Sequence, residues 1–391
     1  MKVLVISHSC VTDVNQQQFV ALQQIPEIEV CLIVPARWRS EYTGKPQIPA
    51  LLPSVNFPVL LLPIMLPGQV SLHFYTHLAV RRLKRFHPDV ILSTQEPWSL
   101  SGLQAVLLAR LLQVPLVFQT NQNILKRYPF PFSWIERASY QTAAIALAYS
   151  EEARQVMLKK GLKRPSQVVP YGTDLSLFQS RPGSPLRHKL KLTDKVVLGY
   201  MGRLVPEKGL NTLILAVKSI LSQKPDFPLT ILIVGTGSEE LALKQQAQKL
   251  EIDSHFIFAG AVPHNQAGEY MNCMDIFVLP SLTMPNWKEQ FGRVIIEAMA
   301  CGVPVVGSDS GQIPILINET GGGLVFKEDH AEDLAAKLSR LLDDSEERVQ
   351  LGKTGQEAVR ASYTYEAVAQ QLHGILREAV EAKSSRAVAA L

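Results

Sequence analysis

VVLGYMGRLVPEKG, residues 196–209, reads as a short apolar strand that runs through a turn into the start of a helix. Gly202 and Gly209 bracket the turn, and two cations, Arg203 and Lys208, lie between them, five residues apart. Glycines at these places favour a tight connection rather than a continued element. A strand, a turn and a helix in this order form the repeating unit of a parallel α/β sheet.

The same alternation of apolar strands and helix-period segments extends in both directions along the chain. Runs that predict strands lie at residues 3–6, 30–34, 59–62, 90–92, 116–118 and 144–148, and then at 196–200, 230–234, 256–258, 276–279 and 304–307. This pattern predicts α/β architecture with doubly wound parallel sheets. Because 391 residues exceed what one hydrophobic core usually organises, we expect two Rossmann-like domains in tandem.

The domain boundary is expected where prolines and a glycine interrupt the pattern. RPGSP, residues 181–185, suits a linker better than the interior of a helix or strand. We therefore predict an N-terminal domain over residues 1–180 and a C-terminal domain over residues 181–364. Residues 365–391 are expected to form a closing helix that crosses back to the N-terminal domain. Its apolar residues fall at helical spacing: Val368, Leu372, Ile375 and Val380.

Composition indicates a well-packed globular protein, with 47% apolar and 19% charged residues. The four scattered cysteines favour reduced core residues over a zinc site or a disulfide framework. The start of the chain lacks a signal-peptide pattern, and prolines break the apolar stretch at residues 50–66, so we expect a cytoplasmic protein without a membrane span. Residues 1–180 hold 17 Lys and Arg against 10 Asp and Glu, whereas the remainder holds 22 against 25. The two halves are therefore expected to meet different partners.

The turn at residues 202–209 suits a diphosphate. Arg203 offers a planar fork to phosphate oxygens, Lys208 offers a point charge, and the following helix start adds backbone N–H groups. The alternative is a solvated basic turn. A second turn, Gly235-Thr236-Gly237, follows the strand at residues 230–234 and is equally compatible with close approach of a ligand and with an ordinary strand-to-helix connection. The first strand lacks G-x-G-x-x-G, which argues against a nicotinamide enzyme.

The most informative stretch is EQFGRVIIEAMACGVP, residues 289–304, because it places two carboxylates eight residues apart. Glu289 lies in a polar loop, and Glu297 lies on an apolar helix that ends at Gly302. Carboxylates accept hydrogen bonds from the vicinal hydroxyls of sugars and riboses. A carboxylate among apolar neighbours would cost several kcal/mol without a partner, which argues against a merely solvated Glu297.

These segments resemble the donor-binding half of glycosyltransferase family 4, whose members are retaining enzymes of the GT-B fold. The resemblance rests on G-R-L-x-x-x-K-G at 202–209, V-G-x-G at 234–237, F-x-G at 258–260, E-x7-E at 289–297 and E-A-M-A-C-G-x-P at 297–304. It implies two Rossmann-like domains that face a central cleft, with an acceptor-binding domain at residues 1–180 and a nucleotide-sugar-binding domain at residues 181–364.

The same resemblance implies catalytic roles for Glu289, Arg203 and Lys208, with Glu297 on the ribose. It also implies a donor site that holds a UDP- or GDP-sugar as co-substrate. The donor-binding residues would be Gly202, Arg203, Lys208, Gly235, Gly237, Glu289, Phe291, Gly292 and Glu297. The family needs no metal or other cofactor, and no D-x-D triplet occurs in this chain.

Several positions depart from the family pattern. Gln290, Gln312 and Ile315 replace residues often seen in members, so their contacts are open. Asn121 stands where many members carry a histidine, and an amide cannot take up a proton at neutral pH. On the acceptor side, His8, Glu96 and Asn121 follow predicted strands and would face the crevice of an open sheet. A satisfied turn residue is the alternative for His8, and a helix-start carboxylate is the alternative for Glu96.

These observations favour a transferase that moves a sugar, with retention of configuration, to a glycan, lipid-linked or small-molecule acceptor, and no nucleic-acid partner is expected. A non-catalytic nucleotide-sugar-binding component, or an epimerase or phosphorylase on the same scaffold, remains as the alternative. The basic excess of residues 1–180 favours peripheral contact with the inner face of a membrane or a phosphate-bearing acceptor. Residues 72–87 are expected to form a basic amphipathic helix, either on a membrane or packed on the sheet with solvated cations.

Overall fold

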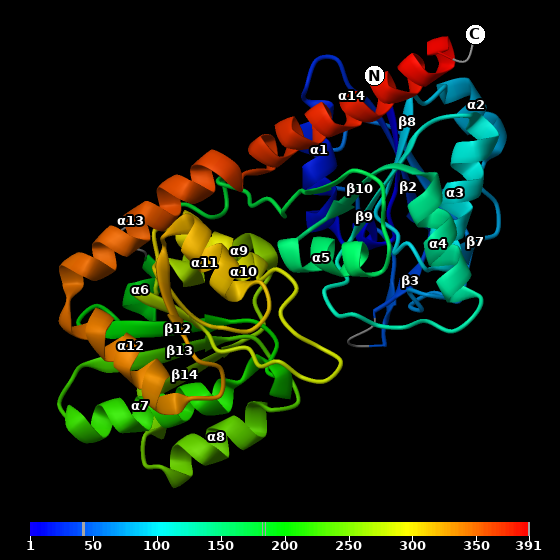
Figure 1. The fold of residues 1–391 in the computed structure, drawn as a ribbon. Coiled ribbons are helices and arrows are strands. Elements are labelled where there is room, and N and C mark those ends of the chain that lie inside the picture. Colours follow the sequence, from blue (N-terminus) through cyan, green and yellow to red (C-terminus); the bar gives the residue numbers. More distant parts are fainter. Residues whose placement is uncertain (41–43, 182, 184, 390–391) are drawn as a thin grey trace. The chain divides into compact units, whose positions relative to one another are not determined.

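The computed structural model describes residues 1–40, 44–181, 183 and 185–389, with side chains in the last helix as far as Ser384. The chain divides into two compact units. Unit 1 comprises residues 1–170 and 365–391, and unit 2 comprises residues 171–364. Each unit is an α/β structure built around its own parallel sheet (Figure 1), which confirms the predicted fold class.

Unit 1 contains a seven-stranded sheet in the order β11-β10-β9-β8-β1-β2-β5. Its strands are β1 (Lys2–Ile6), β2 (Glu29–Pro35), β5 (Val59–Leu62), β8 (Val90–Ser93), β9 (Leu116–Thr120), β10 (Ala143–Ala148) and β11 (Ser166–Val168). All neighbours are parallel; for example, Val3 pairs with Val30 on one side and with Val90 on the other. The inner strands are almost wholly buried, which explains their continuous apolar runs.

Helices cover both faces of this sheet, with α1 and α14 on one and α3 and α4 on the other (Figure 1). The helices of unit 1 are η1 (Ser9–Val11), η2 (Asp13–Gln16), α1 (Gln17–Gln23), α2 (Val80–Phe86), α3 (Leu100–Leu112), α4 (Phe132–Thr142), α5 (Glu151–Lys159) and α14 (Tyr365–Ala389). Two small antiparallel ribbons pair β3 (Trp38–Arg39) with β4 (Pro46–Gln47) and β6 (Ile64–Met65) with β7 (Phe74–Tyr75). Leu372 and Leu376 of α14 are buried in the core of unit 1.

Unit 2 contains a six-stranded parallel sheet in the order β14-β13-β12-β15-β16-β17. Its strands are β12 (Val196–Met201), β13 (Leu229–Val234), β14 (Phe256–Gly260), β15 (Ile276–Leu279), β16 (Val305–Ser308) and β17 (Gly323–Phe326). Its helices are α6 (Pro185–Lys189), η3 (Pro206–Lys208), α7 (Leu210–Gln223), α8 (Glu240–Lys249), η4 (Asp253–His255), α9 (His264–Met271), α10 (Arg293–Ala300), α11 (Ile313–Thr320), α12 (Ala331–Asp343) and α13 (Ser345–Ser362). Helices α7, α8 and α12 cover one face and α9 to α11 the other (Figure 1).

The chain passes from unit 1 to unit 2 between Pro170 and Tyr171, ten residues before the boundary expected at residue 181. Phe178 explains the difference, because its side chain is buried in the core of unit 2. Thr173 also forms a parallel bridge with Thr364, which ties both crossing segments to the same unit. The expected linker at 181–185 therefore falls inside unit 2, and its residues 182 and 184 lie outside the described residues.

The basic amphipathic helix expected over residues 72–87 is wrong in its first half. Residues 74–75 form strand β7, because the Gln104 side chain accepts from the backbone N–H of Tyr75 at 2.8 Å and donates to its carbonyl at 2.7 Å. Helix α2 begins only at Val80, and its Leu83 is fully buried in the core. The neighbouring cations Arg81 and Arg82 are exposed. The helix therefore packs on the unit with solvated cations.

Candidate active site

Two glycine-containing loops pack on one another at the carboxyl edge of the unit 2 sheet. A Cβ atom at Gly235 would lie 1.9 Å from the carbonyl oxygen of Gly202, and one at Gly237 would lie 2.1 Å from that of Leu204. The backbone N–H of Leu204 also donates to the Thr236 carbonyl at 3.0 Å. Gly235 and Gly237 are therefore required because their loop packs directly on the loop after β12. This packing explains the glycines of the turn that follows β13.

The loop after β12 carries Lys208 into a partly buried ion pair. Gly209 lies against the loop after β15, where a Cβ atom would be 2.0 Å from the Pro280 carbonyl oxygen. The Lys208 Nζ atom lies 2.6 Å from Oε2 of Glu289, and the Ser281 hydroxyl donates to the same oxygen at 3.0 Å. The two charged side chains are only 14% and 11% exposed. Removing either charge would leave the other without its compensating partner.

Neighbouring segments fix the position of this pair. The ammonium of Lys208 lies 4.9 Å from the centroid of the Trp287 ring, within the range of a cation–π contact. Gly311 has φ 57°, and its Cβ would lie 2.1 Å from the Glu289 carbonyl oxygen. Gln312, whose contact the sequence left open, donates its backbone N–H to that same oxygen at 3.1 Å. Sequence reasoning missed Trp287 and Ser281, although Ser281 has the recognisable signal of a polar residue just after a predicted strand.

Arg203 lies in the same turn as Lys208, but its guanidinium has a different partner. Its Nη2 atom lies 3.3 Å from Oε1 of Glu207, and the Arg203 side chain is 38% exposed. The buried Tyr200 hydroxyl donates to the Arg203 carbonyl at 2.7 Å, which fixes the backbone of the turn. Arg203 is thus held at its backbone, and its partly exposed guanidinium is paired with Glu207.

Helix α10 begins after Gly292, whose φ of 81° is the left-handed conformation that glycine favours. The ring of Phe291 is buried against Tyr171, with centroids 5.3 Å apart. Glu297 lies in the second turn of this helix and is half-buried. Loop and helix thus place Glu289 within the ion pair and Glu297 farther along the same segment.

In unit 1, the three acceptor-side candidates gather at one edge of the sheet. His8, Glu96 and Asn121 follow β1, β8 and β9, which are neighbouring parallel strands. The Thr120 hydroxyl donates to one oxygen of Glu96 at 2.5 Å, and the backbone N–H of Asn121 donates to the other at 3.3 Å. The structure therefore brings Glu96 and Asn121 into direct contact.

His8 lies among aromatic rings that the sequence gave no reason to connect with it. Its Nδ1 atom is 2.8 Å from Oε1 of Gln95, and its ring centroid is 5.2 Å from those of Trp38 and His73. Burial, aided by the nearby His73, lowers the pKa of His8 to about 4. The imidazole is therefore neutral at pH 7. With the proton on Nδ1 shared with Gln95, Nε2 would hold the lone pair.

Burial also raises the pKa of Glu96 to about 7, despite the hydrogen bonds from Thr120 and Asn121 that favour its charged form. A raised carboxyl pKa stabilises the fold at low pH, and this stability is lost as pH rises from about 4.5 to about 7. We expect Glu96→Gln to remove this loss, because the amide cannot ionise. The Tm of Glu96→Gln minus the Tm of the wild type should then rise between pH 5 and pH 8. The rise corresponds to up to about 3 kcal/mol in the free energy of unfolding.

Glu151→Gln is a matched control for this measurement, because Glu151 lies on α5 of the same unit with its carboxylate 41% exposed and paired with Arg154. This variant measures the effect of replacing an exposed carboxylate of the same unit by an amide. A flat profile for Glu96→Gln would contradict the raised pKa of Glu96.

Other features bear on the classes of protein considered above. The four cysteines are buried and free, as expected. Across the described ranges, no group of three or more His, Cys, Asp or Glu side chains lies close enough to hold a metal ion. None of the helices in the described part of the chain is both long and apolar enough to cross a membrane.

Comparisons with known proteins identify the family. Residues 185–358 match the family described as "Glycosyl transferases group 1", and residues 22–177 match "Glycosyltransferase Family 4". Together the two matches span most of the chain, and they support a glycosyltransferase of the family 4 type. It is 33% identical, over 217 residues, to a GDP-mannose-dependent monoacylated alpha-(1-6)-phosphatidylinositol monomannoside mannosyltransferase of Corynebacterium glutamicum. That match covers 54% of this chain and 55% of the relative, so the chain spans about half the length of the curated relatives that it matches.

A second relative and a solved structure extend the comparison. The sulfoquinovosyl transferase SQD2 of Arabidopsis thaliana is 28% identical over 295 residues, which cover 71% of this chain and 54% of that protein. The crystal structure of HepE from Anabaena in complex with UDP superposes with a TM-score of 0.75 at 20% identity, covering 97% of this chain and 100% of HepE. At this identity the likeness concerns the fold, which is GT-B.

Proposed function

We propose that the protein is a retaining glycosyltransferase that moves a sugar from a UDP- or GDP-sugar to a glycan, lipid-linked or small-molecule acceptor. The observation that carries the proposal is the ion pair between Lys208 and Glu289 at the carboxyl edge of the unit 2 sheet. Ligands bind at this edge in open α/β sheets. The pair holds, side by side, a cation for phosphate oxygens and a carboxylate for sugar hydroxyls.

The donor would use these groups as follows. The diphosphate would bind between Arg203 and Lys208, and Glu297 would accept hydrogen bonds from the ribose hydroxyls. As the bond between C1 of the sugar and the diphosphate oxygen breaks, negative charge grows on that oxygen. The two cations lower the free energy of this charged state because they are already oriented. Glu289 would hold hydroxyls of the transferred sugar while Lys208 turns toward phosphate.

The acceptor would bind at the carboxyl edge of the unit 1 sheet. His8 is neutral at pH 7, so its imidazole can accept a hydrogen bond from an acceptor hydroxyl. The buried Nε2 of Gln95 has no hydrogen-bond partner among the described residues, and such a group favours a polar ligand atom. The acceptor oxygen would form the new bond to C1, and its proton would leave with the nucleoside diphosphate.

The names of the relatives support this class of donor and acceptor. The mannosyltransferase of C. glutamicum is named for GDP-mannose and for a phosphatidylinositol mannoside, and the HepE structure holds UDP. The two nucleotides named, GDP and UDP, differ in their base, so the base of the donor is to be found by experiment.

A donor panel tests the proposal. UDP-, GDP- and ADP-sugars are added one at a time, and we expect the Tm to rise with one of the first two, because a ligand that binds only the folded state stabilises it by mass action. The matching donor should then release nucleoside diphosphate faster when an acceptor is present. EDTA should leave this rate unchanged, since Arg203 and Lys208 are proposed to carry the charge that a metal would otherwise neutralise.

Each alternative predicts a different outcome of this panel. A binding component would show the rise in Tm but no release of nucleoside diphosphate. An epimerase would change the sugar nucleotide without an acceptor. Loss of activity in EDTA with rescue by Mn²⁺ would contradict the metal-free mechanism, and an inverted anomeric centre in the product, read by NMR, would contradict retention.

A further inference from the structure

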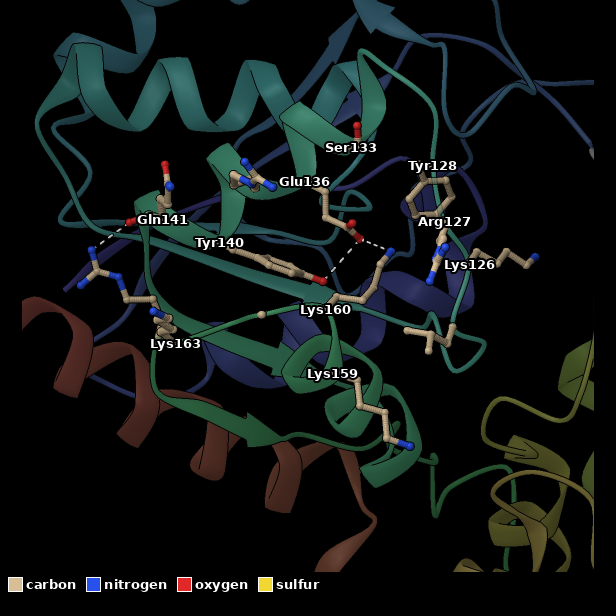
Figure 2. A pocket seen from close by; sticks show the side chains of 14 residues that line it. Lys126, Arg127, Tyr128, Ser133, Glu136, Tyr140, Gln141, Lys159, Lys160 and Lys163 are labelled. Atoms are coloured by element: carbon tan, nitrogen blue, oxygen red, sulfur yellow. Dashed lines mark hydrogen bonds and ion pairs between the residues drawn. The ribbon is translucent and has the colours of Figure 1, made fainter.

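A strongly basic pocket lies in unit 1, and two of its lining residues, Glu136 and Lys160, are close enough to Glu96 to interact with it electrostatically. It has a volume of about 940 Å³ and is lined by the loop at 125–128, by α4 and by the segment at 159–164 that ends α5 and leads toward β11 (Figure 2). This volume lies at the upper end of the range of about 300–1,000 Å³ for small-molecule sites. The pocket is therefore large enough for a ligand with several polar groups.

The floor of the pocket is formed by an ion pair, Lys160 with Glu136, whose two charges cancel. Lys160 Nζ lies 2.5 Å from Oε1 of Glu136, and each side chain is 10% exposed. Figure 2 shows the two charged groups pointing toward one another, with the hydroxyl of Tyr140 beside the carboxylate. Lys160 also lies 4.1 Å from the centroid of the Tyr128 ring. The floor is thus positioned by several contacts, and its one carboxylate is already neutralised.

The remaining charge around the pocket is all positive. Glu136 is the only acidic residue among the described residues that line it. The other charged lining residues are Lys126, Arg127, Arg137, Lys159, Lys163 and Arg164. Six cations around one opening favour an anion with several phosphate or carboxylate oxygens, because Arg and Lys bind such oxygens with charge-assisted hydrogen bonds.

Exposed apolar side chains come from the same segments. Phe130 is 82% exposed, Leu125 57% and Trp134 55%. Phe130 and Trp134 flank the start of α4, and Leu125 lies next to Lys126 in the loop that lines the pocket. Aromatic rings such as Phe130 and Trp134 can stack on sugars or nucleic-acid bases, but the exposed aliphatic side chain of Leu125 has no such role. A bilayer can bind both kinds of side chain, because apolar side chains enter the headgroup boundary while cations contact anionic lipid.

We infer that this pocket binds the phosphate-bearing headgroup of an anionic lipid within a bilayer, with Leu125, Phe130 and Trp134 inserted beside it. The inference deepens the proposed function, on which the link to a lipid-linked acceptor rests. Lys160 and Glu136 keep the floor in place, and the rim cations contact the headgroup. The pocket, rather than α2, is then the main site of membrane contact in unit 1.

Vesicle flotation of the full chain at low salt tests this inference. Binding to phosphatidylcholine vesicles that contain phosphatidylglycerol should exceed binding to phosphatidylcholine alone. Arg137→Glu with Lys163→Glu should lower the affinity for the anionic vesicles by about 10- to 100-fold, because each cation near such a surface contributes up to about fivefold. Phe130→Ser with Trp134→Ser should lower it as well.

The matched control is Arg81→Glu with Arg82→Glu, which reverses the same number of exposed charges on α2 and should change the affinity less than the pocket variant does. Equal or larger loss in this control would overturn the assignment to the pocket. Full displacement of the wild type from the vesicles by inorganic phosphate would also overturn it, because it would indicate a site for free phosphate. Preferential binding of single-stranded RNA would overturn it as well. Far-UV circular dichroism confirms that each variant is folded. Vesicle binding is measured without donor or acceptor, so this inference and the proposed function can fail separately.

Discussion

Lys208→Ala is expected to lower kcat for sugar transfer by about 10²–10³-fold. The substitution removes a cation that is held ready by Glu289, Ser281 and the Trp287 ring, so the charge that grows on the leaving diphosphate loses a preorganised partner. Arg203→Ala should act in the same direction, and Arg203→Lys should not restore the rate, because a point charge cannot replace a bidentate fork. Steady-state kinetics with the matching donor measure both effects.

Lys224→Ala is the matched control for Lys208→Ala. Lys224 also pairs with a carboxylate, that of Asp343, but it follows the far end of helix α7 from the turn at 202–209. Its loss should leave kcat within about twofold, since exposed ion pairs contribute little. Near-normal turnover in both Lys208→Ala and Arg203→Ala would exclude the proposed diphosphate site. Because Lys208→Ala leaves Glu289 without its cation, the assay is run below the measured Tm of the variant.

Glu289→Gln and Glu297→Gln are expected to separate the sugar from the nucleotide. Glu289→Gln should lower kcat by about 10²-fold while leaving nucleoside-diphosphate affinity nearly unchanged, because its carboxylate would hold the transferred sugar. Glu297→Gln should weaken nucleoside-diphosphate binding by about tenfold, the loss expected for a charged hydrogen bond to a ribose hydroxyl. Isothermal titration with UDP and GDP, together with kcat, distinguishes the two.

Asp343→Asn supplies the control for both carboxylates, since it removes an exposed acid of unit 2 that is paired with Lys224. Equal nucleoside-diphosphate affinity in wild type and Glu297→Gln would contradict the ribose assignment. A loss of nucleotide affinity in Glu289→Gln as large as in Glu297→Gln would mean that the two carboxylates do not have separate ligands.

Most strands of both sheets could be predicted because they are buried, continuous apolar runs that need no distant information. β11 was missed, because Ser166–Val168 is short, mostly polar and only partly buried. β17 escaped prediction, since it begins in a run of three glycines; a Cβ at Gly323 would lie 1.9 Å from the Val305 carbonyl oxygen, so packing against β16 excludes the side chains that would have marked a strand. The start of α2 was misplaced for a related reason. Gln104, almost thirty residues farther on, holds Tyr75 in an extended strand.

Most residues of the candidate donor site could be predicted from the sequence, because they fall in two short stretches, 202–209 and 289–304, in which glycines and charged residues follow predicted strands. The surroundings of His8 on the acceptor side could not be predicted, because its partners Trp38, His73 and Gln95 come from three separate segments. The basic pocket of unit 1 was visible only as a regional excess of charge. Its cations come from the loop at 125–128, from the middle of α4 and from the segment at 159–164, and only the folded chain shows that they surround one opening.

The return of α14 to unit 1 has a consequence for how the chain is made. Unit 2 is one uninterrupted segment, residues 171–364, so all of it leaves the ribosome before α14 does. Unit 2 can therefore finish folding first, as contiguous domains do during synthesis. Unit 1 is synthesised earlier but must wait, with the surface that receives Leu372 and Leu376 uncovered, until its last helix emerges. During that interval this uncovered apolar surface is open to aggregation.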